Sequence, residues 1–310
     1  MQVLDAAAVR ARLPYPALVE ALRQRFREGC EVPPRHVHAL GEPGATLLLM
    51  PAWRAGKRLA VKAVNVFGSN AARGLPAVHA SVQLFDAATG VPLAWLDGGE
   101  LTARRTVAAS ALAADYLARP SPEHLLVIGA GRLARELPLA MRTVRPSLRR
   151  FSVWARRRLQ AEALAADWRA LGLAAQACDS LEPAVRQADM VSCATLSESP
   201  LVQGRWLPPG CHLDLIGSFT PAMREADGDC LRRAAVWVDT TEALAKAGDL
   251  LQAQAEGAFD ASALIGDLAG LCRATCRARG RAGEITLFKS VGTALEDLAA
   301  AELAVDGAGG

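Results

Sequence analysis

The stretch HLLVIGAGRLARE, residues 124–136, decides the fold of this chain. A continuous apolar run leads directly into two glycines, and a segment typical of a helix start follows them. Gly129 permits a tight turn, Gly131 lets the backbone approach a pyrophosphate, and Ala134 allows the helix to pack closely on the strand. The stretch therefore predicts the phosphate-binding turn of a dinucleotide-binding domain. Its candidate cofactor residues are Gly129, Ala130, Gly131, Arg132, Leu133 and Ala134.

The pattern of this stretch continues toward the C-terminus, where short apolar strands alternate with helical segments. Continuous apolar runs suit parallel strands that are covered on both faces, and the helices between them supply the crossovers. We therefore predict an α/β fold with a Rossmann-type, doubly wound parallel sheet. Ala194 and Thr195 end the fourth strand, on the side where such sheets bind ligands, and are further cofactor candidates. The predicted strands begin at His124, Phe151, Leu173, Asp189, His212 and Ala235.

The first 118 residues show a different pattern. The sequence predicts an amphipathic helix from Tyr15 to Phe26, several strand-like runs and a hairpin turn at DAATG, residues 86–90. LTARRTVAASALAADYLA, residues 101–118, is rich in alanine and free of glycine and proline, which predicts a long helix. A second, smaller α+β domain therefore precedes the predicted Rossmann domain.

The choice of cofactor depends on the end of the second strand of the Rossmann domain. An acid at this point accepts the ribose hydroxyls of NAD, whereas arginine accommodates a 2′-phosphate. The sequence there is SVWARRRLQAE, residues 152–162, with Arg156 and Arg157 where an acid would stand. The pattern favours NADP(H), with NAD(H) as the alternative. A solvated helix start would also explain these arginines.

Composition excludes several classes of protein. The 310 residues are 51% apolar and 22% charged, which is typical of a folded globular chain rather than a disordered one. A net charge of +3 is too small for a general nucleic-acid binder. No segment approaches the roughly 18 apolar residues of a membrane span, so we predict a soluble, cytoplasmic protein without a membrane partner. No HExxH is present and the closest cysteines are spaced CRATC, so no metal site is predicted.

A series of motifs resembles the ornithine cyclodeaminase/mu-crystallin family, in order and across nearly the whole chain. The resemblance implies an NAD(P)-dependent oxidoreductase that forms a homodimer. It further implies that residues 1–118 and 286–310 form a substrate-binding and dimerisation domain around a Rossmann domain at 119–285. The motifs include RHV (35–37), LAVKAVNVF (59–67), LFDAATGVPLAWLDG (84–98), RRTVAASA (104–111) and FKSVG (288–292).

The same resemblance implies roles for individual residues. Arg35, Lys62 and Arg105 form a cationic cluster that holds the α-carboxylate of a small imino or amino acid, and Lys62 and Arg105 are the catalytic candidates. Lys62 would also relay a proton. Without the resemblance, these residues are better explained as a loop arginine, an edge-strand lysine and a surface helix arginine.

Three further positions match family segments that approach the cofactor. These are Thr106, Ser290 and Val291. For Ser290, an N-cap of the final helix is an equal alternative.

One departure from the family narrows the predicted reaction. Cyclodeaminases carry an aspartate in a G-G-D-x-P context after the fifth strand, whereas this chain has Phe219 in GSFTP, residues 217–221. Phenylalanine cannot accept a proton from an amine. The acid that precedes the LMP motif in those enzymes is also absent, because Leu47, Leu48 and Leu49 stand before Met50.

We therefore predict an NAD(P)H-dependent reductase of cyclic ketimine carboxylates. It would form L-proline from Δ1-pyrroline-2-carboxylate, or L-pipecolate from Δ1-piperideine-2-carboxylate. The alternatives are an ornithine cyclodeaminase, an imino acid reductase resembling alanine dehydrogenase, and a non-catalytic, crystallin-like protein that binds a small ligand in the presence of NADP.

Overall fold

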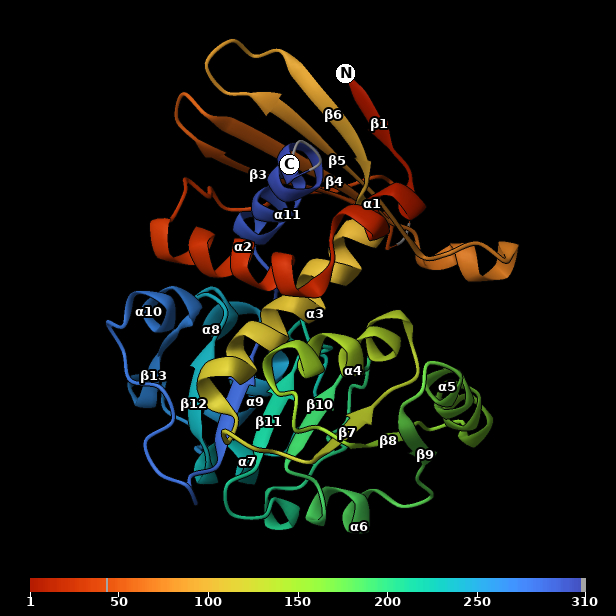
Figure 1. Cartoon of the computed structure of the whole chain (residues 1–310), viewed down its shortest axis with the longest axis vertical. Helices are drawn as coiled ribbons and strands as arrows, with labels where there is room; N and C mark the ends of the chain where they lie inside the picture. Colours follow the sequence, from red (N-terminus) through yellow and green to blue (C-terminus); the bar gives the residue numbers. More distant parts are fainter. Residues whose placement is uncertain (43, 308–310) are drawn as a thin grey trace. The chain divides into compact units, whose positions relative to one another are not determined.

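A computed structural model describes residues 1–42 and 44–307 of the chain. The chain divides into two compact units. The terminal unit comprises Met1–Thr106 and the segment from Thr293 onward, and the central unit is Val107–Gly292 (Figure 1). Residues 308–310, which the sequence assigned to the smaller domain, lie outside the described residues.

The central unit contains an eight-stranded parallel sheet in the order β13-β12-β14-β11-β10-β7-β8-β9. This arrangement confirms the predicted α/β fold with a doubly wound parallel sheet. The sequence predicted six of its strands and missed two, β13 and β14. The strands are β7 (His124–Ile128), β8 (Arg150–Trp154), β9 (Ala174–Ala177), β10 (Met190–Cys193), β11 (His212–Leu215), β12 (Ala235–Val238), β13 (Leu264–Asp267) and β14 (Thr286–Lys289).

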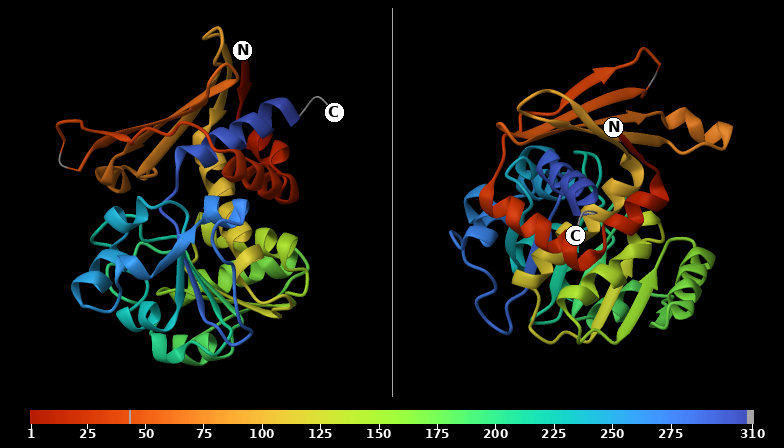
Figure 2. Two further views of the ribbon diagram at one scale, coloured as in Figure 1. Left: turned by 90° about the vertical axis from the view of Figure 1, so that its left-hand side faces the viewer. Right: turned by 45° about the horizontal axis from the view of Figure 1, so that its top comes forward.

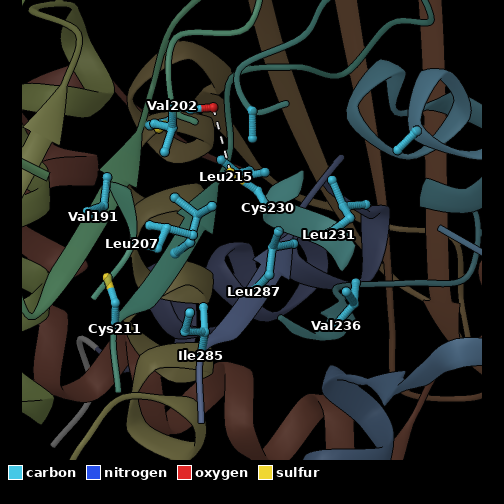
Figure 3. Close-up of a cluster of buried hydrophobic side chains, with 14 of the residues drawn as sticks. Val191, Val202, Leu207, Cys211, Leu215, Cys230, Leu231, Val236, Ile285 and Leu287 are labelled. Carbon is cyan, nitrogen blue, oxygen red and sulfur yellow. Dashed lines mark hydrogen bonds between the residues drawn. The ribbon is translucent and has the colours of Figure 1, made fainter. Parts of the chain in front are cut away.

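The predicted domain boundary at residue 286 is wrong. β14 lies between β11 and β12, and all of its residues are buried, so it belongs to the centre of the parallel sheet. Figure 3 shows why: Leu287 of β14 packs in one apolar cluster with Leu215 of β11 and Val236 of β12. The boundary near residue 118 also moves, because the two units separate within a helix, between Thr106 and Val107.

Helices connect the strands of the central unit. Helix α4 packs against β7, and α5 packs against both β8 and β9. No helix among the described residues is long and apolar enough to cross a membrane. The helices are α3 (Gly98–Leu117), which begins in the terminal unit, α4 (Arg132–Val144), α5 (Arg158–Ala170), α6 (Leu181–Arg186), α7 (Gly228–Arg233), α8 (Ala243–Lys246), α9 (Gly248–Ala255) and α10 (Leu268–Arg273).

The terminal unit contains a six-stranded sheet in the order β1-β6-β5-β4-β3-β2. β1 is parallel to β6, and the other pairs are antiparallel, including the predicted hairpin of β5 and β6. The predicted amphipathic helix is also present, as α2. The strands are β1 (Gln2–Leu4), β2 (His36–Ala39), β3 (Thr46–Arg54), β4 (Arg58–Val66), β5 (Val78–Asp86) and β6 (Pro92–Asp97), and the helices are α1 (Ala6–Arg12), α2 (Tyr15–Glu28) and α11 (Ala294–Asp306).

Helix α11 packs on one face of this sheet, against β3, β4 and β5 (Figure 2). Because strand side chains alternate between faces, Met50, Lys62 and Val82 lie on one face, opposite one another in register, and all three are buried. The face toward α11 is therefore the core of the terminal unit, and Lys62 lies within it.

Candidate active site

A cavity of about 280 Å³ lies at the carboxyl edge of the parallel sheet. Three segments form it, each following a strand: the glycine turn after β7, the start of α5 after β8, and the loop after β10. This is the edge at which open α/β sheets bind ligands. The lining residues are Gly129, Ala130, Gly131, Trp154, Ala155, Arg156, Arg157, Gln160, Ala194, Thr195, Leu196, Ser197 and Leu201.

The two glycines of the turn have different reasons to be glycine. Gly129 has a φ of +119°, and a Cβ there would lie 2.5 Å from the carbonyl oxygen of Ala194. A Cβ on Gly131, in contrast, would meet no atom within 4 Å. Gly131 is the N-cap residue of α4 and offers no side-chain acceptor to the first turn. An uncapped helix start beside open space is suited to a phosphate group.

The predicted cofactor residues of α4 do not line the cavity. Ala134 is completely buried, which fits close packing of the helix on the sheet, while Leu133 is half-buried and Arg132 is exposed. In the described structure, the turn itself therefore borders the cavity, and the residues after it support the turn.

Both arginines predicted to select the cofactor line the cavity and are exposed. Arg157 donates from Nε to Gln160 Oε1 at 3.1 Å. The next arginine, Arg158, is not a lining residue and forms ion pairs with Glu162 and Asp179, at 2.7 and 2.6 Å. No acid is among the lining residues of this cavity in the described part of the chain. The electrostatics of this end of the cavity suit an anion.

Two buried carboxylates that the sequence analysis missed hold predicted cofactor residues in place. Glu225 accepts hydrogen bonds from the backbone N–H and the hydroxyl of Thr195, at 2.7 and 2.9 Å. Asp239 Oδ2 accepts from Ser290 Oγ at 3.0 Å and from the Val291 N–H at 2.8 Å. Burial raises the pKa of Glu225 to about 7 and also raises that of Asp239. The sequence offered one clue, for Asp239 alone, which directly follows the apolar run AVWV at residues 235–238.

The alternative for Ser290 is wrong. Thr293, not Ser290, is the N-cap residue of α11, with its side chain accepting from Leu295 N. Ser290 instead lies in the central unit, 2% exposed and bonded to Asp239.

In the terminal unit, Lys62 and Arg105 meet at one carboxylate. Lys62 Nζ lies 2.6 Å from Asp297 Oδ2, and Arg105 Nε lies 3.0 Å from Asp297 Oδ1. Arg105 Nη1 also lies 2.5 Å from Glu296 Oε2. All four side chains are buried. The descriptions of Arg105 as a surface residue and of Lys62 as an edge-strand charge are therefore wrong, since β4 is an inner strand.

Burial perturbs the charges of this cluster. Burial and, to a lesser extent, the nearby charge of Arg105 lower the pKa of Lys62 to about 8, against the attraction of Asp297. Burial also acts to raise the pKa of Asp297, but Lys62 and Arg105 outweigh it and hold that pKa below its ordinary value. Nη2 of Arg105 takes part in neither of its two carboxylate bonds. The cluster thus contains a lysine close to its titration point beside an arginine with one nitrogen outside these bonds.

The remaining predicted residues lie at defined places. Arg35, half-buried, directly precedes β2, whose register sets His36 beside Leu49, so Arg35 lies near the level of Met50 and Lys62. Thr106, the last residue of the first segment of the terminal unit, is 8% exposed. Phe219, in the loop after β11, is 47% exposed.

The sequence profile of the ornithine cyclodeaminase/mu-crystallin family matches residues 3–309. The chain belongs to this family. The family resemblance stated from the motifs is thereby confirmed.

Three relatives show how closely the chain follows other members. The Δ1-pyrroline-2-carboxylate reductase of Paracoccus denitrificans is 41% identical over 300 residues, covering 96% of this chain and 94% of the relative. The structure of the Thermococcus litoralis Δ1-pyrroline-2-carboxylate reductase with NADH and L-proline has a TM-score of 0.93, with 32% identity and coverage of 99% and 97%. An archaeal alanine dehydrogenase dimer with bound NAD has a TM-score of 0.92, with 28% identity and coverage of 99% and 95%.

Proposed function

We propose that this chain reduces cyclic ketimine carboxylates, Δ1-pyrroline-2-carboxylate or Δ1-piperideine-2-carboxylate, to the corresponding cyclic amino acids. It is an NAD(P)-dependent oxidoreductase that acts on carbon–nitrogen bonds. The observation that carries the proposal is the buried Lys62–Arg105 pair, in a chain related along its whole length to two pyrroline-2-carboxylate reductases.

The cavity of the central unit fits a nicotinamide dinucleotide. The open space at Gly131 and the uncapped start of α4 match a pyrophosphate. The two arginines, Arg156 and Arg157, match an anionic group on the ribose. When bound, this cofactor supplies the hydride. We assign the holding of it to the glycine turn, to Arg156 and Arg157, and to the loop of Ala194 and Thr195, with Thr106, Ser290 and Val291 as further contacts.

Lys62 and Arg105 would handle the substrate. Arg105 binds the α-carboxylate through Nη2, with Arg35 as a second cation, which orients the adjacent imine carbon for reduction. Lys62 holds a proton at Nζ, and its lowered pKa makes that proton available to the imine nitrogen near neutral pH. Asp297 bonds both cations and fixes their spacing.

Phe219 favours an imine over a diamino acid as substrate. Deamination of ornithine needs a base that receives a proton from the amine, and phenylalanine cannot serve. An imine is already oxidised at the carbon and needs only hydride, a proton and an anchored carboxylate. Reduction of an open-chain imine is the second candidate, supported by the similarity to the alanine dehydrogenase.

A substrate panel tests this proposal directly. The purified protein is given each cyclic imine, pyruvate with ammonia, and ornithine with NAD⁺, and the absorbance of the reduced nicotinamide is followed. We expect the highest kcat/KM with a cyclic imine. Preference for pyruvate with ammonia would favour the open-chain alternative, and ammonia release from ornithine at a comparable rate would restore the cyclodeaminase assignment. Cofactor binding without turnover of any of these would favour the non-catalytic, crystallin-like alternative.

We further propose a preference for NADP(H), resting on Arg156 and Arg157. Replacing both with alanine should raise KM for NADPH at least tenfold, about 1.4 kcal/mol, and leave NADH little changed. Arg158→Ala is the matched control, because this arginine is paired with acids and does not line the cavity. Equal losses with both cofactors, or a wild-type preference for NADH, would contradict the assignment.

A further inference from the structure

One buried side chain joins two loops at the carboxyl edge of the parallel sheet. Glu225 Oε1 accepts from the N–H and the hydroxyl of Thr195, in the loop after β10. Its Oε2 accepts from the N–H groups of Gly217 and Ser218, in the loop after β11, at 2.8 and 3.2 Å. Glu225 is 0% exposed. A single carboxylate therefore satisfies four donors from two separate segments.

Glu225 is itself held by a second buried carboxylate. Asp249 Oδ1, in α9, accepts from the N–H groups of Glu225 and Ala226 at 2.7 and 3.0 Å. Its Oδ2 lies 3.1 Å from Nζ of Lys289 at the end of β14, and both side chains are fully buried. The backbone at Glu225 is thus fixed to the sheet through a chain of charged groups, and its carboxylate has little freedom to follow the loops if they move.

The segments that Glu225 joins are packed without spare room. A Cβ on Gly217 would lie 2.0 Å from the Thr195 carbonyl oxygen and 2.4 Å from Glu225 Oε1. On its other side, the loop after β10 approaches the phosphate-binding turn so closely that a Cβ on Gly129 would lie 2.5 Å from the Ala194 oxygen. The loop of Ala194 and Thr195 is therefore enclosed between the glycine turn and the loop after β11. Displacing it would alter the wall of the cavity.

We propose that Glu225 is a positioning residue for cofactor binding: it holds Thr195 and its loop against the glycine turn and so sets the shape of the dinucleotide cavity. Glu225 is not a lining residue of that cavity and acts through Thr195. This inference rests on the proposed function, since it takes the cavity to be the cofactor site.

The variant Glu225→Gln tests the proposal, because its amide keeps the size of the side chain but places an NH2 group against N–H donors. The control is Asp227→Asn, the same chemical change two residues away. Asp227 also accepts two backbone N–H groups, from Gly204 and Cys230, but neither residue lines the cavity. We expect Glu225→Gln to raise the Kd of NADPH, measured by its fluorescence, at least about tenfold, and Asp227→Asn less than about twofold.

Amide hydrogen exchange provides a readout that simple destabilisation would not give. In Glu225→Gln, exchange should accelerate at Thr195, Gly217 and Ser218 relative to the strands of the same sheet, and Asp227→Asn should leave these amides unchanged. Thr195→Val, which loses only the hydroxyl, gives a milder second variant should Glu225→Gln fail to fold; it should raise the Kd of NADPH and speed exchange at the Thr195 amide. In a double-mutant cycle the two substitutions should be less than additive in their effect on NADPH binding.

The outcomes separate this inference from the proposed function. Unchanged exchange at Thr195 and Gly217, or equal loss of NADPH affinity in Glu225→Gln and Asp227→Asn, would reject Glu225 as a positioning residue. A wild-type protein that binds NADPH but reduces no imine would reject the proposed reaction and leave the role of Glu225 supported by the binding data.

Discussion

At the scale of single residues, four charged side chains, Lys62, Arg105, Glu296 and Asp297, are buried together. Buried ions lose hydration, and well-packed apolar residues of similar volume are often equally stable, so ion pairs alone are weak grounds for a stabilising role. A lysine with its pKa lowered to about 8, beside a fixed arginine, is instead typical of a functional site. We interpret the cluster as a site for an anionic substrate.

The first prediction separates Arg105 from its neighbour. Arg105→Ala should lower kcat/KM for imine reduction at least 100-fold, about 2.7 kcal/mol or more, because the substrate carboxylate loses its principal partner. Arg104→Ala is the control. Arg104 is also buried in α3, but it donates to the Leu13 carbonyl and lies over the Tyr15 ring, 4.2 Å from its centroid. Steady-state rates normalised to folded protein check this, and equal losses in both variants would argue against a specific role for Arg105.

The second prediction concerns pH. Lys62 is charged below its pKa of about 8 and neutral above it. Imine reduction consumes a proton, so kcat/KM should fall about tenfold per pH unit above pH 8. Lys62→Arg stays charged throughout this range, so its kcat/KM should not fall in this way above pH 8. The kcat/KM of this variant should be lower than that of the wild type at every pH. Titration of the imine itself is common to both enzymes, so an identical limb in both would assign it to the substrate rather than to Lys62.

At the scale of elements, sequence reasoning found the residues that local structure determines. The strand–glycine–helix pattern identified the turn after β7, because Gly129 is required there by its own φ and by close packing. The buried carboxylates could not be found in this way. Glu225 bonds a residue 30 positions away, Asp239 one 51 away and Asp297 one 192 away, and these distances are set by topology alone. β14 was missed for the same reason, since its place between β11 and β12 is non-local.

The third prediction uses the two glycines of the turn to separate folding from binding. Gly131→Ala meets no atom of the chain, so thermal unfolding should be nearly unchanged, while the new methyl group enters the space assigned to the pyrophosphate. Its Kd for NADPH should rise at least about tenfold. Gly129→Ala should lower both stability and affinity, because its φ is positive and its Cβ would contact the Ala194 oxygen. Full NADPH affinity in Gly131→Ala would place the cofactor elsewhere.

At the scale of the whole molecule, the two faces of the sheet in the terminal unit differ. Helix α11 packs on the face that carries Lys62. The face opposite Lys62 is lined by half-buried or exposed side chains, among them Leu49, Val61, Phe85 and Trp95, the last 41% exposed. Gln83 lies between Val61 and Trp95 in register, and exposed apolar side chains grouped in this way are typical of a protein–protein interface. We propose that a second copy of the chain covers this face, because the centre of one sheet can pack on the same surface of another about a two-fold axis.

The last prediction tests that assembly. At micromolar concentration the wild-type chain should sediment as a dimer, at twice 32.7 kDa. Val61 lies on β4, an inner strand of this sheet, so Val61→Lys would bury a charge in the proposed interface and should shift the protein to the monomer. Leu171→Lys is the control, because Leu171 is 60% exposed and belongs to the central unit rather than to this sheet. A wild-type monomer would refute the dimer, and a dimer that persists in Val61→Lys would place the interface on another surface. Lys62 follows Val61 in β4 and pairs with Asp297 on the opposite face of the sheet. Loss of the dimer should therefore loosen β4 and lower kcat/KM, whereas the affinity of the central unit for NADPH should be retained.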